Sequence, residues 1–564
     1  MENEKKYFED HYNPVILKDI ESDENLAICS SLGSGKSISV KKYISMNPDK
    51  KILLVVNKNI NQQEYKDDLP TRIIYVDSDS RIKLKEATQM LYETPLSCVC
   101  ITKVRFNYMV TVNTSLFDGF DKIIIDESNG INPIIQDKFD DSLKSLLETL
   151  GSILKLMDDE GYNNGKELLD FLYELNAKFI REKKITKMLQ LSVDEKYRIL
   201  ASSLKKSLLA LYEDDKINEH NIHKIFGMLN SIIDDELHFN EYNSSKGKQS
   251  SILFCNRFLR DFIKEKGVSV KVLDGTAKFL EPLYTWLGIK IKDDYKENLE
   301  EYPNMKIHYY KFDDVTPFEG RSNQEVKERM LQFIEKEKIP EDFLLFTDKS
   351  SSEIFSRAFI NTRYAFSGDD VGSNEFMDEE NLVVVFYNTL PQSFRLLYNK
   401  EIKGMDLKRA SSILELEIAE YELVGSMMVQ IVGRTAIRKD NNANVNIYMF
   451  CVPPTTARSI QHHYKIPRHN IKVYNASLDL RKKVNLAVSG LFYLIEMELK
   501  TNVKEIDILE MAKEYYGDKL NKGTIKHVKS RNKDKFLELA NKYGITYNTR
   551  GRQGWSYIQK GTKS

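Results

Sequence analysis

Short apolar runs alternate with polar stretches of helical length over the first 130 residues. The runs cover residues 26–30, 52–57, 73–76, 98–102 and 123–126. Near-continuous apolar strands between helices are typical of a parallel sheet that is covered on both faces. The pattern therefore predicts an α/β lobe. Comparable runs extend this character into the second half of the chain, at 270–274, 343–348, 383–387 and 445–450.

Residues 134–250 follow a different period. Apolar side chains recur there at three- and four-residue steps, as in Leu143, Leu146, Leu147, Leu150, Ile153, Leu154 and Met157. This spacing is that of one helix face. We therefore expect an all-helical insertion within the first lobe. Its leucine stripes favour a role in packing over a partner-binding surface.

These changes of pattern predict the domain organisation. Lobe 1 is expected at 1–133 and 251–300, interrupted by the insertion at 134–250. Lobe 2 is expected at 301–490, after a charged, Pro-containing stretch near 298–304. Residues 491–564 are expected to form a helical and basic C-terminal segment.

Composition narrows the class of protein without identifying it. The chain has 564 residues, 41% of them hydrophobic, and its charged residues (30%) nearly cancel to a net −1. The net charge therefore does not indicate a nucleic-acid partner, and only local clusters of basic residues could indicate one. The charged N-terminus lacks an apolar signal, and no apolar run approaches the ~18 residues of a membrane span. We expect a soluble, intracellular protein that is not secreted and has no membrane partner.

The five cysteines include no C-x-x-C pair and no zinc-ligand spacing. Cys98 and Cys100 lie in an apolar run, which predicts reduced thiols in the core. His462 and His463 are adjacent in a polar stretch, and a metal-ligand role for them is the less favoured interpretation.

One glycine-rich stretch carries the strongest chemical signal. The sequence LAICSSLGSGKS, residues 26–37, is an apolar strand followed by a glycine-rich turn and a helix start. This is the P-loop arrangement, in which backbone N–H groups hold phosphates. Lys36 would reach the β- and γ-phosphates, and the Ser37 hydroxyl would bind Mg²⁺. The expected nucleotide-binding residues are Ser31, Leu32, Gly33, Ser34, Gly35, Lys36 and Ser37. Ser30 departs from the motif, where its first glycine is expected.

A second signal is the apolar strand that ends in two carboxylates, IIIDESN at residues 123–129. The C-terminal edge of a parallel sheet is where ligands bind in open α/β folds. Asp126 would hold Mg²⁺, and Glu127 would polarise the attacking water. A strand that merely runs into an acidic turn is the alternative.

The third signal is QIVGRTAIR, residues 430–438. Arginine suits a γ-phosphate contact because it is always charged and its planar fork matches phosphate oxygens. We therefore predict that Gln430, Arg434 and Arg438 belong to the catalytic site. A solvated basic helix end is the alternative interpretation.

In this order the three motifs resemble those of superfamily 2 helicases, which implies two RecA-like lobes with ATP and Mg²⁺ bound between them. The resemblance assigns Thr276, in DGTA at 274–277, to coupling of the ATP state to the nucleic acid. It assigns Thr102 to strand contact. It also places Ser373 and Asn374, in the sequence GSNEF, against the backbone of the tracked strand.

Within this superfamily the chain looks like the herpesvirus origin-binding-protein type, which viruses, phages and plasmids share. The resemblance rests on SLGSGKS, DESN, DGTA, GSNEF and QIVGRTAIR. It implies a DNA helicase or translocase in genome replication. Two features depart from it. The usual arginine spacing would fall on Ile437, which favours Arg434 as the phosphate contact. The second and third motifs normally lie much closer together than Asp126 and Asp274 do, which again indicates an insertion, and no Gln-based adenine motif precedes the P-loop.

The C-terminal segment is a candidate nucleic-acid contact. Residues 511–564 contain 13 Lys/Arg and 4 Asp/Glu, with seven aromatic residues interleaved. Basic groups neutralise phosphates, and aromatic rings stack on unpaired bases. A solvated tail is the alternative.

Three other functions remain open at this stage. DNA is favoured over RNA as the partner, so an RNA helicase is the nearest alternative. A DNA-packaging ATPase shares the P-loop and the acidic strand but does not explain QIVGRTAIR. A catalytically weak origin-binding or scaffold protein is disfavoured by the intact Lys36, Ser37, Asp126, Glu127 and Arg434.

Overall fold

The computed structural model describes residues 11–478 and, beyond them, residues 505–507, 541, 545–550 and 555–560. Within 11–478 the description leaves out residues 32, 57–61, 63–64, 66, 70, 77–83, 94–95, 113–116, 127–133, 139–141, 182–188, 191–192, 215, 218, 236, 245–246, 256, 313, 316–319, 321–322, 338, 341, 360–362, 367–375, 388–389 and 391.

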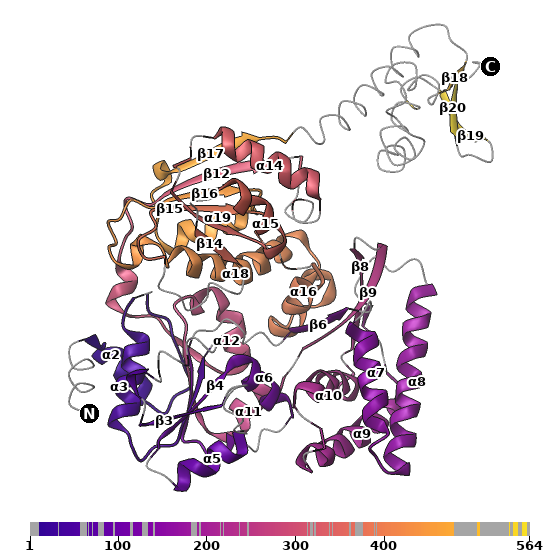
Figure 1. Cartoon of the computed structure of the whole chain (residues 1–564). Helices are drawn as coiled ribbons and strands as arrows, with labels where there is room; N and C mark the ends of the chain where they lie inside the picture. The colour runs from indigo at the N-terminus through magenta and orange to yellow at the C-terminus, as the bar shows by residue number, and fades with distance from the viewer. Residues whose placement is uncertain are drawn as a thin grey trace. The chain divides into compact units, whose positions relative to one another are not determined.

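Contacts divide the chain into two units. The first combines Met1–Tyr310 with Pro340–Tyr474, and the second combines Lys311–Ile339 with Asn475–Ser564. The sequence-based division differs from this one, because it assigned all of 301–490 to lobe 2. The first unit holds two parallel sheets, which we call lobe 1 and lobe 2 (Figure 1).

Lobe 1 is built on a seven-stranded sheet in the order β11-β1-β10-β5-β2-β4-β3. All neighbouring strands pair in parallel. The strands are β1 (Leu26–Ile28), β2 (Ile52–Val56), β3 (Ile73–Val76), β4 (Cys98–Thr102), β5 (Lys122–Asp126), β10 (Ser269–Leu273) and β11 (Lys290–Lys292). The helices are α2 (Pro14–Glu21), α3 (Lys36–Met46), α5 (Leu84–Glu93), α6 (Lys103–Val112), α11 (Phe258–Lys266) and α12 (Glu281–Leu287), with the 3₁₀ turns η2 (Ala277–Leu280) and η3 (Lys296–Leu299).

Both faces of this sheet are buried, which explains the continuous apolar runs. Alternate residues of β2, such as Leu54 and Leu53, point to opposite faces. Leu54 packs with α2 and α3. Leu53 belongs to the cluster that contains residues of α6, α11 and α12. Cys98 and Cys100 are buried and are not joined in a disulfide, so the expected core thiols are confirmed.

Two buried lysines hold the C-terminal end of helix α2. The Asn13 side chain caps the start of α2, and the last carbonyls of a helix likewise need donors. The Lys122 ammonium donates to the carbonyls of Ile20 at 2.6 Å and Ser22 at 2.7 Å. Lys271 donates to the carbonyl of Glu24 and to the Ser22 hydroxyl. Burial lowers the pKa of Lys122 to about 8 and that of Lys271 to about 7.

Stability should therefore rise with pH in alkaline solution. Above its lowered pKa each lysine is neutral in the folded chain but still charged in the unfolded chain, so the unfolded state binds more protons. The free energy of unfolding should then increase from about pH 7 toward pH 10, by at most about 1.4 kcal/mol per pH unit for each lysine. Lys271→Met should flatten this slope in denaturant unfolding at pH 7–9.5. The exposed Lys290→Met on neighbouring β11 is the control, and an unchanged slope in Lys271→Met would contradict the assignment.

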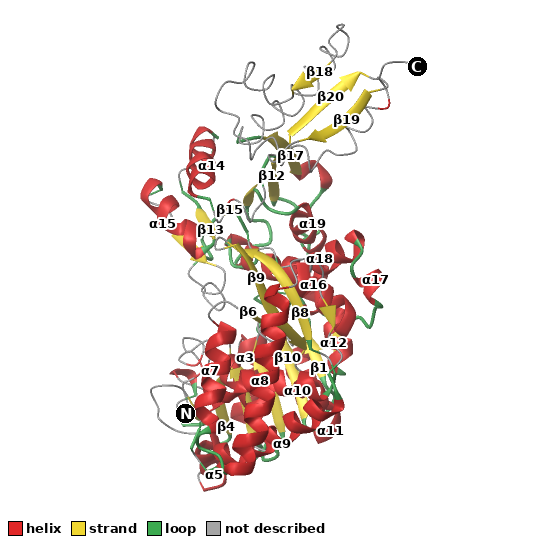
Figure 2. Ribbon diagram, turned by 90° about the vertical axis from the view of Figure 1, so that its right-hand side faces the viewer, coloured by secondary structure: helices red, strands yellow, loops and turns green. Residues whose placement is uncertain are grey.

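The insertion between β5 and β10 is mostly helical but is not all-helical as the sequence predicted. Its helices are α7 (Ser142–Leu154), α8 (Asp159–Arg181), α9 (Glu195–Glu213) and α10 (Glu219–Ile233). They share a core in which Leu147, Leu150, Leu204 and Leu208 are buried, so the packing role of the leucine stripes is confirmed. The correction is an antiparallel sheet in the order β6-β9-β8-β7. Its strands are β6 (Ile134–Lys138), β7 (Leu189–Gln190), β8 (His238–Ser244) and β9 (Gly247–Cys255), whose long β8–β9 hairpin is visible in Figure 2.

Lobe 2 is built on a six-stranded sheet in the order β14-β13-β15-β16-β12-β17. The pairs from β14 to β12 are parallel. Its strands are β12 (Lys306–Phe312), β13 (Leu344–Thr347), β14 (Arg363–Phe366), β15 (Asn381–Val385), β16 (Asn446–Phe450) and β17 (Ile471–Ala476). Its helices are α15 (Lys349–Ala358), α16 (Gln392–Leu397), α17 (Leu407–Ala410), α18 (Ile413–Val432) and α19 (Pro454–His463), with the shorter turns η4 (Tyr398–Ile402) and η5 (Ala436–Arg438). The predicted fold class, two RecA-like parallel-sheet lobes, is confirmed.

The two lobes share one hydrophobic core. Phe394, Leu397 and Tyr398, from the lobe 2 segment that follows β15, are buried in the same cluster as Val272 and Leu283 of lobe 1. Ion pairs also cross between the lobes, since Arg257 at the start of α11 lies 2.9 Å from Glu401. Segment 392–423 of lobe 2 therefore packs against lobe 1 and stabilises the contact between the lobes.

The second unit contains α14 (Gln324–Lys336) and a three-stranded antiparallel sheet in the order β18-β20-β19. The strands are β18 (Glu505–Asp507), β19 (Ile545–Arg550) and β20 (Trp555–Lys560). The expectation that 491–564 is helical is therefore wrong for these described residues. No helix in the described part of the chain is both long and apolar enough to cross a membrane.

Candidate active site

A glycine-rich turn joins β1 to α3 at the C-terminal edge of the lobe 1 sheet. Gly33 and Gly35 have φ angles of 82° and 80°, in the left-handed region where side chains are strained. Gly35 immediately precedes α3. The local geometry thus explains why the sequence has glycine at these two positions and leaves backbone N–H groups at the start of α3.

The Lys36 ammonium lies inside this turn. It donates to the carbonyl oxygens of Ser30 at 2.6 Å and Ser31 at 2.7 Å, and it lies 3.5 Å from the Ser34 hydroxyl. Gly275, from the DGTA sequence, closes the turn from the other side. A methyl group added at Gly275 would lie 3.0 Å from the Ser30 carbonyl oxygen and 3.7 Å from Lys36 Nζ. The motif after β10 is therefore in contact with the turn, which leaves little room for a side chain at this position.

The end of β5 places Asp126 beside the first turn of α3. The Ser37 hydroxyl lies 3.2 Å from Asp126 Oδ2 and 3.5 Å from Oδ1. Tyr65 donates its hydroxyl to the same Oδ2 at 2.7 Å. Burial, with a further contribution from Asp126, raises the pKa of Tyr65 well above 10, so this phenol stays protonated and remains a donor.

The Ser37 and Asp126 oxygens fit a magnesium ion. Mg²⁺ prefers hard oxygen ligands, and it is usually held by one or two carboxylates together with substrate phosphates. In the described part of the chain, no group of three or more His, Cys, Asp and Glu side chains could hold a metal. The Ser37 hydroxyl and the Asp126 carboxylate lie beside the glycine-rich turn, and they match a site in which one carboxylate is completed by substrate phosphates.

A buried hydrogen-bond network connects this site to lobe 2. Asp274 Oδ1 accepts from the Thr276 hydroxyl at 2.7 Å and from the Thr276 N–H at 2.8 Å, while Oδ2 accepts from the Tyr284 hydroxyl at 2.7 Å. Gln430, on α18 of lobe 2, donates its amide N–H to the Thr276 hydroxyl at 3.0 Å. Asp274 and Thr276 are each 1% exposed. The network is therefore shielded from water, and it passes from one lobe to the other.

The two candidate arginines follow α18. Arg434 is 2% exposed. Arg438, in η5, lies directly against the glycine-rich turn. A methyl group added at Gly33 would lie 3.5 Å from the Arg438 carbonyl oxygen and 3.9 Å from its Cγ. The structure thus brings Gln430 and Arg438 to the lobe 1 site.

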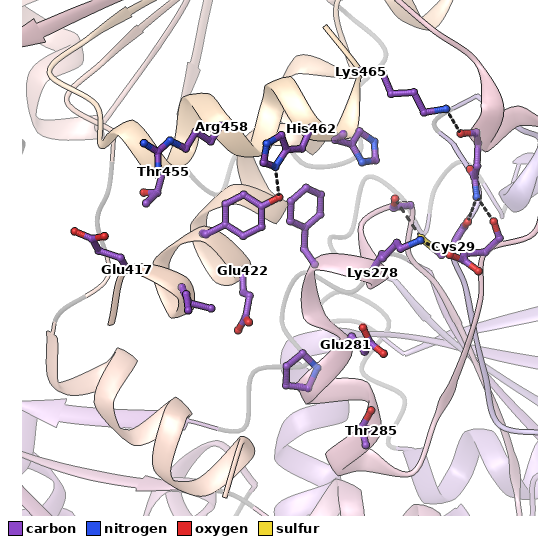
Figure 3. A pocket seen from close by; sticks show the side chains of 18 of the residues that line it. Cys29, Lys278, Glu281, Thr285, Glu417, Glu422, Thr455, Arg458, His462 and Lys465 are labelled. Atoms are coloured by element: carbon purple, nitrogen blue, oxygen red, sulfur yellow. Dashed lines mark hydrogen bonds and ion pairs between the residues drawn. The ribbon is translucent and has the colours of Figure 1, made fainter. Parts of the chain in front are cut away.

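A cavity of about 1380 Å³ opens between the lobes next to this network (Figure 3). It is lined at one end by Ser31 and Gly275, and elsewhere by side chains of η2, α12, α18 and α19. Burial lowers the pKa of one lining residue, His463, to about 4, so that imidazole is neutral at pH 7. The Tyr421 hydroxyl lies 3.1 Å from Nδ1 of another lining residue, His462, which is labelled in Figure 3.

The remaining predicted site residues have different outcomes. Leu32, Glu127, Ser373 and Asn374 lie outside the described residues. Thr102 ends β4, and its hydroxyl accepts from the N–H of Arg105 at 3.4 Å in the first turn of α6. Its assignment to strand contact stays a prediction.

The sequence reasoning missed Tyr65 and Tyr284, whose hydroxyls hold the two site aspartates. Neither tyrosine belongs to a recognised motif. Tyr65 lies 61 positions from Asp126, and no local pattern predicts that contact. Tyr284 lies only 10 positions after Asp274, on the helix that follows DGTA. This short separation in sequence is the one signal that could have predicted the contact.

No protein-family model and no curated protein matches the chain. Several solved structures resemble it in fold. One, described as "XPD_APO", gives a TM-score of 0.45 at 13% identity, over 81% of this chain and 99% of that one. Xpd4 of S. tokodaii gives 0.44 at 12% identity, over 84% and 100%. Mss116p bound to ssRNA and AMP-PNP gives 0.33 at 8% identity, over 87% and 79%. Similarity at this level shows nothing about the activity of this chain.

Proposed function

We propose that the chain is an ATP-driven nucleic-acid motor, a helicase or translocase of the superfamily 2 type. The observation that carries the proposal is the Gln430–Thr276 hydrogen bond, because it joins lobe 2 to the turn that contacts the phosphate loop. A nucleotide bound at Lys36 and Ser37 would lie beside this connection. The geometry thus provides a physical route from phosphate binding to the relative position of the lobes.

The chain's own residues would act in the following way. Backbone N–H groups at the start of α3 and the Lys36 ammonium would bind the phosphates. Ser37 and Asp126 would hold Mg²⁺, which neutralises phosphate charge when bound. Glu127, the residue after Asp126, would orient the attacking water. Arg434 and Arg438 would supply guanidinium charge from lobe 2 when the lobes close.

DNA is the proposed nucleic acid, and replication of a viral, phage or plasmid-like genome is the proposed role. Both rest on the resemblance of SLGSGKS, DESN, DGTA, GSNEF and QIVGRTAIR to the origin-binding-protein type of helicase. An RNA helicase shares every feature of the ATP site. The basic segment 511–564 is proposed as a second nucleic-acid contact.

One experiment tests the function directly. ATP hydrolysis is measured while single-stranded DNA, single-stranded RNA and duplex DNA are titrated in parallel. We expect hydrolysis to be stimulated most by single-stranded DNA. Greater stimulation by RNA would make the chain an RNA motor. Nucleotide binding without hydrolysis under all three conditions would indicate the catalytically weak scaffold protein.

Thr276→Ala should separate the two activities of such a motor. The hydroxyl that joins Asp274 to Gln430 is lost, while Lys36, Ser37 and Asp126 stay in place. We expect ATP hydrolysis to continue and strand separation to fall roughly tenfold, a typical coupling effect. Thr276→Ser retains the hydroxyl and is the matched control. Equal loss of both activities in Thr276→Ala would make Thr276 a structural residue only.

A further inference from the structure

Segment Gln62–Leu69, which follows β2, is bound to lobe 1 by three side-chain contacts, one of which reaches the site. The Gln62 amide donates to the carbonyl of Cys100 in β4 at 3.3 Å. Tyr65 donates to Asp126 at 2.7 Å. Asp68 pairs with Lys41 of α3 at 2.5 Å. The three contacts reach β4, β5 and α3, and the last two of these elements carry the Asp126 and Ser37 oxygens of the proposed magnesium site.

Tyr65 itself is fully enclosed. Its side chain is 1% exposed and packs in the cluster that contains Val40, Ile44 and Ile124. The Lys41 ammonium lies 5.0 Å from the centre of its ring, close enough for a cation–π attraction. Lys41 is one helical turn after Ser37, so the ring is fixed against the same helix that carries the Ser37 hydroxyl.

A carboxylate oxygen that accepts two hydroxyl donors has a restricted orientation. Asp126 Oδ2 accepts from Tyr65 at 2.7 Å and lies 3.2 Å from the Ser37 hydroxyl. The bond from Tyr65 is the shorter of the two. When Mg²⁺ binds, the Ser37 oxygen would turn its lone pairs toward the ion, whereas the Tyr65 hydroxyl can keep its bond. Residues that orient a metal-binding carboxylate in this way commonly determine metal affinity.

We infer that Tyr65 is a positioning residue of the magnesium site, which holds Asp126 in the orientation that binds the ion. The inference rests on the proposed ATPase function. Tyr65 contacts neither the nucleotide nor the reacting phosphate in this assignment, and it acts only through Asp126. Its loss should therefore weaken the response to Mg²⁺ and leave metal-independent nucleotide binding intact.

Tyr65→Phe tests the inference, because it removes one oxygen and keeps the ring. ATP binding to the full chain is measured by calorimetry in excess EDTA and again across a Mg²⁺ titration. We expect equal affinity in EDTA and a half-saturating Mg²⁺ concentration about tenfold higher in the variant, the effect of one lost hydrogen bond to a charged group. Excess Mg²⁺ should restore most of the ATP turnover.

Tyr43→Phe is the matched control. Tyr43 is a buried tyrosine of α3 in the same cluster, and its substitution should leave the Mg²⁺ titration unchanged. Equal half-saturation in Tyr65→Phe and the wild type would overturn the inference. So would a loss of turnover that excess Mg²⁺ does not restore while EDTA binding is normal. If Tyr65→Phe unfolds, Asp68→Asn is the second test, because it weakens the ion pair that holds the segment on Lys41. We expect a smaller increase in the half-saturating Mg²⁺ concentration, and an unchanged concentration would also contradict the inference. A wild-type chain that shows no Mg²⁺-dependent ATP binding would instead refute the proposed function.

Discussion

Replacement of Lys36 by alanine should reduce ATP turnover to the background rate, a loss of at least about 10²–10³-fold. The Lys36 ammonium lies inside the glycine-rich turn, where it donates to the carbonyl oxygens of Ser30 and Ser31. Without it, negative charge that develops on the transferred phosphate lacks this compensation. Steady-state phosphate release with saturating nucleic acid measures the effect.

The control for this variant is Lys42→Ala. Lys42 lies on the same helix, and its ammonium lies 5.3 Å from the centre of the Tyr12 ring. Thermal unfolding of both variants separates a loss of chemistry from a loss of fold. Near-normal turnover in folded Lys36→Ala would remove the glycine-rich turn from the mechanism.

Arg438→Ala should lower turnover by about 10³-fold while nucleotide affinity changes little, because an arginine finger acts mainly in the transition state. The sequence spacing favoured Arg434 for this contact. The structure places the backbone of Arg438 against Gly33, which makes Arg438 a second candidate for this contact. Arg434 is almost completely buried, so its alanine variant should also show a lower melting temperature.

Single-turnover kinetics and nucleotide binding on both variants decide between the arginines. Lys439→Ala is the matched control, since its ammonium pairs with Asp378 at the surface. Normal turnover in Arg438→Ala, with a large loss in folded Arg434→Ala, would return the assignment to Arg434. Normal turnover in both would exclude an arginine finger from this segment.

The sequence predicted most strands of the two lobes because the strands are buried on both faces. A strand such as β2 has only apolar residues, whereas a surface helix has apolar residues along one face only. The insertion sheet was missed for the opposite reason. Its strand β8 reads HFNEYNS, and β9 starts with GKQSS, so the polar residues resemble a linker. The hairpin is stabilised by pairing between the two strands. The hydrophobic pattern of each segment alone does not predict which segments pair.

The candidate site was predictable where its residues lie close together in sequence. Lys36 and Ser37 follow the glycines that position them, and Asp126 ends an apolar strand. Contacts made through the fold were not predictable. Tyr65 reaches Asp126 only because β2 and β5 are neighbours in the sheet, an arrangement that strand order alone creates. The same reason applies to Arg438, whose place beside Gly33 depends on how lobe 2 meets lobe 1.

The core that the lobes share limits how they can move. Phe394, Leu397 and Tyr398 are packed among lobe 1 side chains, and pulling them apart would expose a large apolar surface to water. Full separation of the lobes is therefore disfavoured, and rotation about this packed segment is the motion of low cost. The segment then acts as a pivot. Sites near it move little, whereas sites far from it travel through an arc, so the step length of the proposed motor depends on the distance between the pivot and the strand that it tracks.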